Sequence, residues 1–232
     1  ALKEDARVTH TLHRTRYTPL EHEEYIVFVM AAQGFNSDGA GPKLAKIFEI
    51  MLRHQPVNAG DDNIGGLLTG ETVESILSHA SNKSYMAAVY DTREKAEAAV
   101  KDIKEADLGI SVVMTGDRAK IFSILESVGL RPHTVNLSLG FLGRREKLPP
   151  PEILDITSMC GHGMVCPDHV KYVVRQIESG KMTVREAALD LARPCTCAMF
   201  NPRRAEEVLT RICRARTLTG SPVADGEGGA GQ

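Results

Sequence analysis

The first two thirds of the chain alternate short apolar runs with amphipathic stretches. β-Branched and aromatic residues predict strands at 24–32, 84–91, 108–116 and 133–140. Between them, apolar residues recur at spacings of three and four, which predicts helices at 41–54, 92–106 and 117–130. This order predicts an α/β or α+β layered domain whose mixed sheet is covered by helices, with strands that are at least partly parallel.

The pattern changes after the proline-rich segment KLPPP at 147–151. No strand pattern follows, and helices are predicted at 167–179, at 183–192 and from residue 202 onward. We therefore predict two domains and a tail: an α/β domain over 1–146 that binds a ligand or partner, a small all-helical domain over 152–216 that carries the clustered cysteines, and a Gly-rich disordered tail over 217–232.

Composition describes an ordinary globular chain. Of its 232 residues 42% are hydrophobic and 25% charged, and the net charge of -2 gives no reason to expect nucleic acid as a partner. No apolar run is long enough to span a bilayer, and the first residues, ALKEDARVTH, lack the apolar stretch of a secretory signal. We expect a cytoplasmic protein with no membrane partner, and in that reducing compartment paired cysteines more often ligate metals or act as catalytic thiols than form disulfides.

Four of the five cysteines fall in two short clusters, CGHGMVCP at 160–167 and PCTCAMFNP at 194–202. Cys166 directly precedes a predicted helix, and Cys197 lies four residues before Asn201, the predicted cap of the last helix. Free N–H groups and the positive end of the helix dipole stabilise thiolates at such positions. Glycines on both sides of His162 let the backbone approach a metal centre closely.

The cysteine spacings favour an iron-sulfur cluster over zinc. C-x5-C and C-x-C do not match the knuckles of structural zinc sites, whereas iron-sulfur clusters tolerate irregular spacing. We predict a cluster, [4Fe-4S], with the ligands Cys160, Cys166, Cys195 and Cys197. His162 competes with Cys166 for the fourth place and is the candidate catalytic residue. Zinc, a thiol redox pair and four buried thiols remain alternatives, and Cys213 is expected to be a packing residue.

Two Gly-rich loops flank the first predicted helix. In QGFNSDGAGPKL, the residues Gly34, Gly39, Gly41 and Lys43 are weak candidates for an anion site, because backbone N–H groups converge at a helix start. A plain loop with Pro42 at the first helical position explains this segment about as well. The second loop, NAGDDNIGG, is expected to be a surface turn.

These features predict a cytoplasmic iron-sulfur protein that acts in redox chemistry or as a cluster-dependent enzyme on a small anionic substrate; whether it is an enzyme stays open. Three ligating cysteines would leave one iron open to substrate, and four would favour electron transfer. The alternatives are a metal-free α/β ligand-binding domain with buried or redox-sensing thiols, and a zinc-stabilised accessory subunit. The expected partners are a small anionic ligand or a redox protein, within a homo-oligomer or a larger complex.

Overall fold

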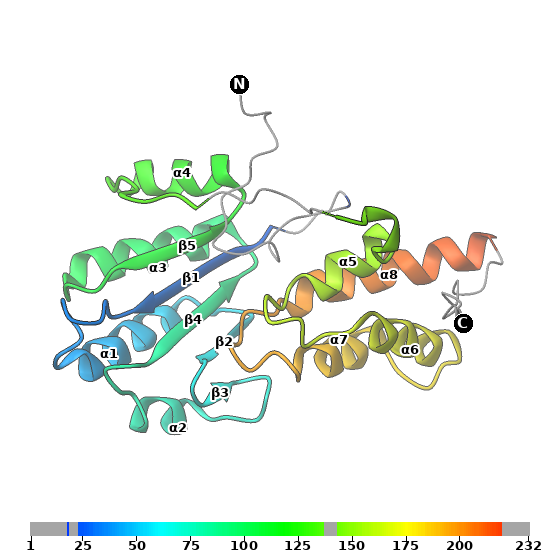
Figure 1. The fold of residues 1–232 in the computed structure, drawn as a ribbon, viewed down its shortest axis with the longest axis horizontal. Coiled ribbons are helices and arrows are strands. Elements are labelled where there is room, and N and C mark those ends of the chain that lie inside the picture. The colour runs from blue at the N-terminus through cyan, green and yellow to red at the C-terminus, as the bar shows by residue number, and fades with distance from the viewer. Residues whose placement is uncertain (1–17, 19–22, 137–142, 220–232) are drawn as a thin grey trace.

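The computed structural model describes residues 18, 23–136 and 143–219 of the chain (Figure 1). The strands are β1 (Tyr25–Met30), β2 (Asn58–Asp61), β3 (Gly65–Gly66), β4 (Tyr85–Tyr90) and β5 (Val112–Gly116). The helices are α1 (Ala40–Arg53), α2 (Val73–Ser78), α3 (Arg93–Ala106), α4 (Arg118–Ser127), α5 (Pro151–Thr157), α6 (Pro167–Glu178), α7 (Val184–Ala192) and α8 (Pro202–Thr219), with a 3-10 turn η2 at Arg145–Lys147.

The five strands form one sheet in the order β3-β2-β4-β1-β5, and every neighbouring pair is antiparallel. The prediction of a mixed sheet with parallel neighbours is therefore wrong. Helix α1 connects β1 to β2, and α3 connects β4 to β5. The two strands of each such pair run in the same direction, because both are antiparallel to the strand between them. These are two interleaved split β-α-β units, the ferredoxin-like arrangement.

Most elements predicted from the periodicity are confirmed, within a few residues at their ends. The predicted strand at 133–140 is an exception, since residues 133–136 have no regular structure and 137–140 lie outside the described residues. The short β2–β3 hairpin was not predicted. It consists of Asn, Ala, Gly and Asp, which strands normally avoid, so neither propensity nor alternation marks it.

Both faces of the sheet are covered. Alternate residues of β1, namely Tyr25, Val27 and Val29, belong to one core cluster with apolar residues of α1 and α3. The residues between them, Ile26 and Phe28, belong to a second cluster with Cys160, Cys195, Cys197 and apolar residues of α5 to α8. Since successive side chains of a strand point to opposite faces, β1 separates two cores and is apolar along most of its length.

In the described chain after residue 147 every regular element is a helix, and these helices share a core with the sheet. In Figure 1 the helices α5 to α8 gather beside the sheet, near β2. The boundary at 147–151, and the status of this helical part as a domain, stay predictions. Of the predicted tail, residues 217–219 belong to α8, and the rest lies outside the described residues. None of the described helices is both long and apolar enough to cross a membrane.

A buried ion-pair network connects the helical part to the sheet. The Arg204 side chain of α8 is only 1% exposed. It donates hydrogen bonds to Glu24, just before β1, at 3.2 Å and to Asp155 of α5 at 2.9 Å. Asp155 also accepts a hydrogen bond from the backbone N–H of Thr18 at 2.9 Å. Removing one member of such a network would leave the others as uncompensated buried charges.

We predict that Arg204→Met destabilises the protein strongly. The substitution leaves Glu24 and Asp155 buried together without their shared cation, which should lower the free energy of unfolding by about 3–5 kcal/mol. Arg203→Met is the matched control, because the Arg203 side chain is 50% exposed and reaches Glu206 only at 3.7 Å; its effect should stay within about 1 kcal/mol. Urea unfolding of both variants measures the difference, and equal effects would contradict the assigned role of Arg204.

Candidate metal centre

Three cysteine side chains meet where the helical part lies against the sheet. Cys160 follows α5, whereas Cys195 and Cys197 lie in the loop between α7 and α8. They are 3%, 1% and 2% exposed, respectively. The Sγ atoms of Cys195 and Cys197 are 3.6 Å apart, and the Cys160 and Cys195 thiols are hydrogen-bonded. All three are free thiols, so the structure brings three of the four predicted ligands together.

The fourth predicted ligand, Cys166, has another structural role. It is exposed and caps the N-terminus of α6, as its place in the sequence suggested. Its Sγ accepts a hydrogen bond from the backbone N–H of His169 at 3.4 Å. Among the described residues, the hydrogen bonds that link the three buried thiols do not include Cys166. Cys213 is partly buried in α8 and packs against the core cluster, as expected.

Two tight turns present the three thiols. In the turn after α5, the Cys160 carbonyl accepts a hydrogen bond from the N–H of Gly163 at 3.1 Å, and Gly163 has a left-handed φ of 67°. In the other loop, the Cys195 carbonyl accepts from the N–H of Ala198 at 3.1 Å, and Ala198 has a φ of 57°. A non-glycine residue in this region is uncommon, so neighbouring contacts must hold Ala198 there.

The β2–β3 hairpin provides those contacts. A Cβ atom on Gly66 would lie 2.6 Å from the Cβ of Ala198, and one on Gly60 would lie 2.8 Å from it. Both separations are too short for real carbon atoms, so only glycine at these two positions lets the cysteine loop lie on the sheet. Asn58 of β2 adds a hydrogen bond from its Nδ2 to the Phe200 carbonyl at 3.0 Å. The loop with Cys195 and Cys197 thus packs against the β2–β3 hairpin, which was not predicted from the sequence periodicity.

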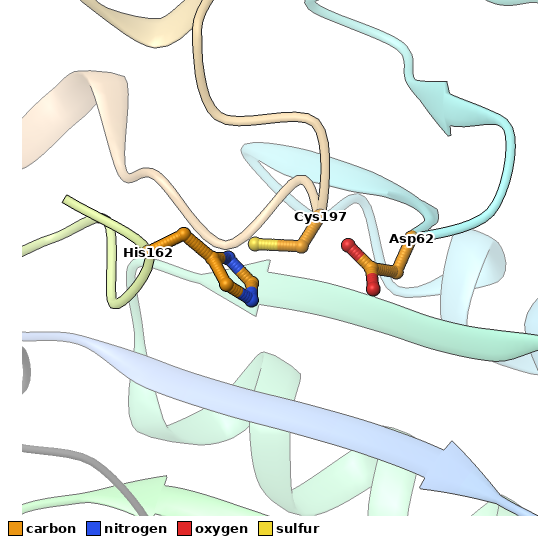
Figure 2. Close-up of side chains that lie close together, drawn as sticks. All are labelled: Asp62, His162 and Cys197. Carbon is orange, nitrogen blue, oxygen red and sulfur yellow. The ribbon is translucent and has the colours of Figure 1, made fainter. Parts of the chain in front are cut away.

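The same hairpin adds a carboxylate to the site. Buried Asp61 accepts hydrogen bonds at its Oδ1 from the backbone N–H groups of Asn63, at 3.0 Å, and Tyr85, at 3.3 Å. This turn leaves the next residue, Asp62, exposed. Figure 2 shows Asp62, His162 and Cys197 close together, each from a different loop, and their ligand atoms all lie within 4.8 Å of one another.

Asp62 was not predicted as a site residue from the sequence. Its loop, NAGDDNIGG, was expected to be only a surface turn, and its one signal was a pair of aspartates between glycines. His162, a candidate from sequence, does lie at the site, where it is exposed and contacts Cys197.

Hydrogen bonds favour the ionised form of Cys160. The Cys195 thiol is the main cause and lowers the pKa of Cys160 to about 5, although burial of Cys160 opposes this. The backbone N–H groups of Met164 and His162 also donate to the Cys160 sulfur and lower its pKa further. The pKa of Cys195 itself is raised, first by its hydrogen bonds to Cys160 and Cys197 and then by burial, so Cys195 stays a protonated donor between two thiolates.

Cys197 is stabilised as a thiolate in a similar way. A hydrogen bond from Cys195 lowers the pKa of Cys197 to about 6 against the effect of burial, and the Met199 N–H and His162 contribute in the same direction. In turn, the hydrogen bond with Cys197 raises the pKa of His162. The site therefore favours negative sulfur, the form in which cysteine ligates a metal.

The weak anion-site candidates lie in the loop after β1 and at the start of α1. Gly34 and Gly39 have left-handed φ values of 79° and 68°, which explains why glycine occurs there. The N–H of Gly41 already donates to Asn82 Oδ1 at 3.0 Å, so one donor that an anion would need is engaged. Lys43 is exposed. An anion role for this loop stays a prediction.

Comparisons with protein-family models, with curated proteins and with solved structures found no match for this chain. The donors of the site itself therefore indicate its chemistry. Three thiols, an imidazole and a carboxylate form a mainly soft donor set, and thiolate ligands select zinc, copper(I) or iron-sulfur clusters over hard cations.

We predict that Gly66→Ala disturbs the cysteine loop and that Ala198→Gly rescues it. The new Cβ would overlap the Ala198 side chain and should cost about 1–3 kcal/mol of folding free energy. Removing the Ala198 Cβ in the double variant clears this overlap and also suits the positive φ at that position. A double-mutant cycle by urea unfolding measures the coupling.

Gly60→Ala serves as the matched control for this cycle. A Cβ there would also lie 2.5 Å from the Gly65 carbonyl oxygen, so Ala198→Gly should not rescue it. If the changes in unfolding free energy of Gly66→Ala and Ala198→Gly are additive in the double variant, the hairpin does not hold the cysteine loop through this contact.

We predict that reduced, metal-free protein carries thiolates at neutral pH. As the pH falls, the far-ultraviolet thiolate absorbance should disappear in steps near pH 6, for Cys197, and pH 5, for Cys160. Cys195→Ala removes the shared donor, so both pKa values should rise and the absorbance at neutral pH should fall; Cys213→Ala should leave it unchanged. Thiolate absorbance that develops only in alkaline solution would refute the assigned hydrogen bonds.

Proposed function

We propose that this chain is a cytoplasmic iron-sulfur protein whose cluster is held by Cys160, Cys195 and Cys197. The observation that carries the proposal is the convergence of three buried, free thiols from two loops, with His162 and Asp62 beside them. These five donors exceed the four that a tetrahedral zinc ion takes, which favours a centre with several metal atoms.

The surroundings of the sulfurs also suit a cluster. Backbone N–H groups donate to Cys160 from His162 and Met164, and to Cys197 from Met199. Hydrogen bonds to ligand sulfurs, together with exclusion of solvent, are the features by which proteins stabilise iron-sulfur clusters and tune their potentials. The reducing cytoplasm is the compartment in which such thiols stay free.

The exposed side of the centre is where a substrate or redox partner would approach. Asp62 and His162 are both exposed, whereas the three thiols are buried behind them. A small anionic substrate or a partner protein would thus meet these two side chains first.

A zinc site is the second candidate function, and two observations favour it. Two thiolates on one tetrahedral zinc, with Zn–S bonds of about 2.3 Å, lie roughly 3.8 Å apart; the Cys195 and Cys197 sulfurs are 3.6 Å apart. Asp62, His162 and Cys197 also lie close enough together to share one ion. A cluster would require the Cys195 and Cys197 sulfurs to separate onto different irons, and in the zinc alternative the metal would stabilise an accessory subunit.

We predict that the full chain, purified without oxygen, contains iron and acid-labile sulfide in equal amounts and is brown. Replacing Cys160, Cys195 or Cys197 by Ser should abolish most of the iron and the visible absorbance, because each variant removes a thiolate ligand. Cys166→Ser and Cys213→Ser are the matched controls and should keep both. Elemental analysis and visible spectroscopy of all five variants provide the measurement.

Three results would contradict the proposal in different ways. Zinc without iron or sulfide would select the zinc site. Folded protein without any metal would leave a thiol site without a cluster. Iron that survives all three of the Cys160, Cys195 and Cys197 substitutions would place the cluster elsewhere in the chain.

A further inference from the structure

Three of the four clustered cysteines are linked to one another by hydrogen bonds, and Cys166 is not among them. Cys166 is exposed, and its sulfur caps α6 by accepting the His169 N–H. A [4Fe-4S] cluster on Cys160, Cys195 and Cys197 therefore has one iron corner without a cysteine ligand. If the chain binds a cluster as proposed above, that corner needs a ligand from elsewhere.

Two polar side chains lie beside the thiols on the exposed part of the site. Asp62 and His162 are the exposed members of the site, and both lie within 4.8 Å of the Cys197 sulfur. In Figure 2 the Cys197 side chain lies between the imidazole and the carboxylate, and both are close to it. One ring nitrogen of His162 is hydrogen-bonded to that sulfur, so the other can still interact with a ligand.

The Asp62 carboxylate restricts what that ligand can be. An ionised carboxylate only accepts hydrogen bonds, so it favours a neighbouring ligand with an O–H group and disfavours a bare anion at the same place. Water and hydroxyl oxygens satisfy this condition, and oxygen is a suitable donor for an iron that acts as a Lewis acid. His162 can donate to a second, anionic oxygen of the same molecule.

We propose that the open iron corner faces Asp62 and His162 and carries an exchangeable oxygen ligand: water in the resting protein, replaced by the hydroxyl group of a small hydroxy-carboxylate substrate. This inference rests on the proposed iron-sulfur function. Asp62 accepts the hydrogen bond of the ligand O–H, and His162 binds the substrate carboxylate. The centre then acts as a Lewis acid and not as an electron-transfer relay.

The test uses the anaerobically purified full chain, with the cluster reduced to its paramagnetic state in water labelled with the magnetic isotope of oxygen. Electron-nuclear double resonance should detect hyperfine coupling from one bound oxygen. Glycolate, the simplest hydroxy-carboxylate, is the probe; unlabelled glycolate should remove this coupling as it displaces the labelled water. Asp62→Ala should weaken glycolate binding at least about tenfold, which corresponds to the loss of a hydrogen bond to a charged group.

Two control variants separate this role from a merely structural one. Asp168→Ala also removes an exposed carboxylate, with a side chain 88% exposed, but from the first turn of α6, and should leave glycolate binding unchanged. Cys166→Ser should retain both the iron and the oxygen coupling. An equal loss in Asp62→Ala and Asp168→Ala would contradict the role given to Asp62.

Failure of this inference is distinguishable from failure of the proposed function. A cluster that shows no oxygen coupling, and that loses iron in Cys166→Ser, has four cysteine ligands; the iron-sulfur function then stands and the open corner does not. Protein without iron and sulfide overturns both.

Discussion

Ala198 lies against a part of the sheet that has no side chains, and the arrangement of the metal centre depends on this contact. Gly60 and Gly66 leave room for the Ala198 methyl group, so the loop that carries Cys195 and Cys197 can approach the β2–β3 hairpin at van der Waals distance. This approach places Cys197 next to Asp62, which the same hairpin presents. The turn after α5 then brings Cys160 next to Cys195 and His162 next to Cys197. Thus a steric property of two glycines brings together donors that are about 100 residues apart in sequence.

The electrostatics of the site follow from this packing. Burial alone would protonate thiols, because a charged sulfur is costly away from water. Here hydrogen bonds from Cys195 and from backbone N–H groups outweigh burial at Cys160 and Cys197. A metal would replace the Cys195 proton, since Cys195 is hydrogen-bonded to both the Cys160 and the Cys197 sulfur. The buried Arg204 network supports this arrangement from a distance, since it connects α5 and α8, the helices next to the cysteine turns, to the chain just before β1.

The elements with strong periodicity could be predicted from sequence, and the site only in part. The apolar alternation of β1 and the amphipathic faces of α1, α3 and α6 show clearly, because burial on a regular element leaves a regular pattern. The antiparallel sheet could not be predicted from element order, since which strand separates two crossover partners is decided by long-range packing. Cysteine clustering indicated Cys160, Cys195 and Cys197, which the structure brings together, whereas Cys166, close to Cys160 in sequence, caps α6. Asp62 lies on the β2–β3 hairpin, which consists largely of glycine and polar residues. This hairpin contributes to the site through its contact with Ala198, and such a long-range contact leaves no local pattern in the sequence.

The most direct test of the account is a crystal structure of the anaerobically purified protein with anomalous diffraction recorded on both sides of the iron absorption edge. We expect a strong iron signal in contact with the sulfurs of Cys160, Cys195 and Cys197, with Asp62 and His162 beside its fourth corner and no signal at Cys166. A single peak that does not change across the iron edge and becomes strong only above the zinc edge, or the absence of any peak among the three sulfurs, would contradict it.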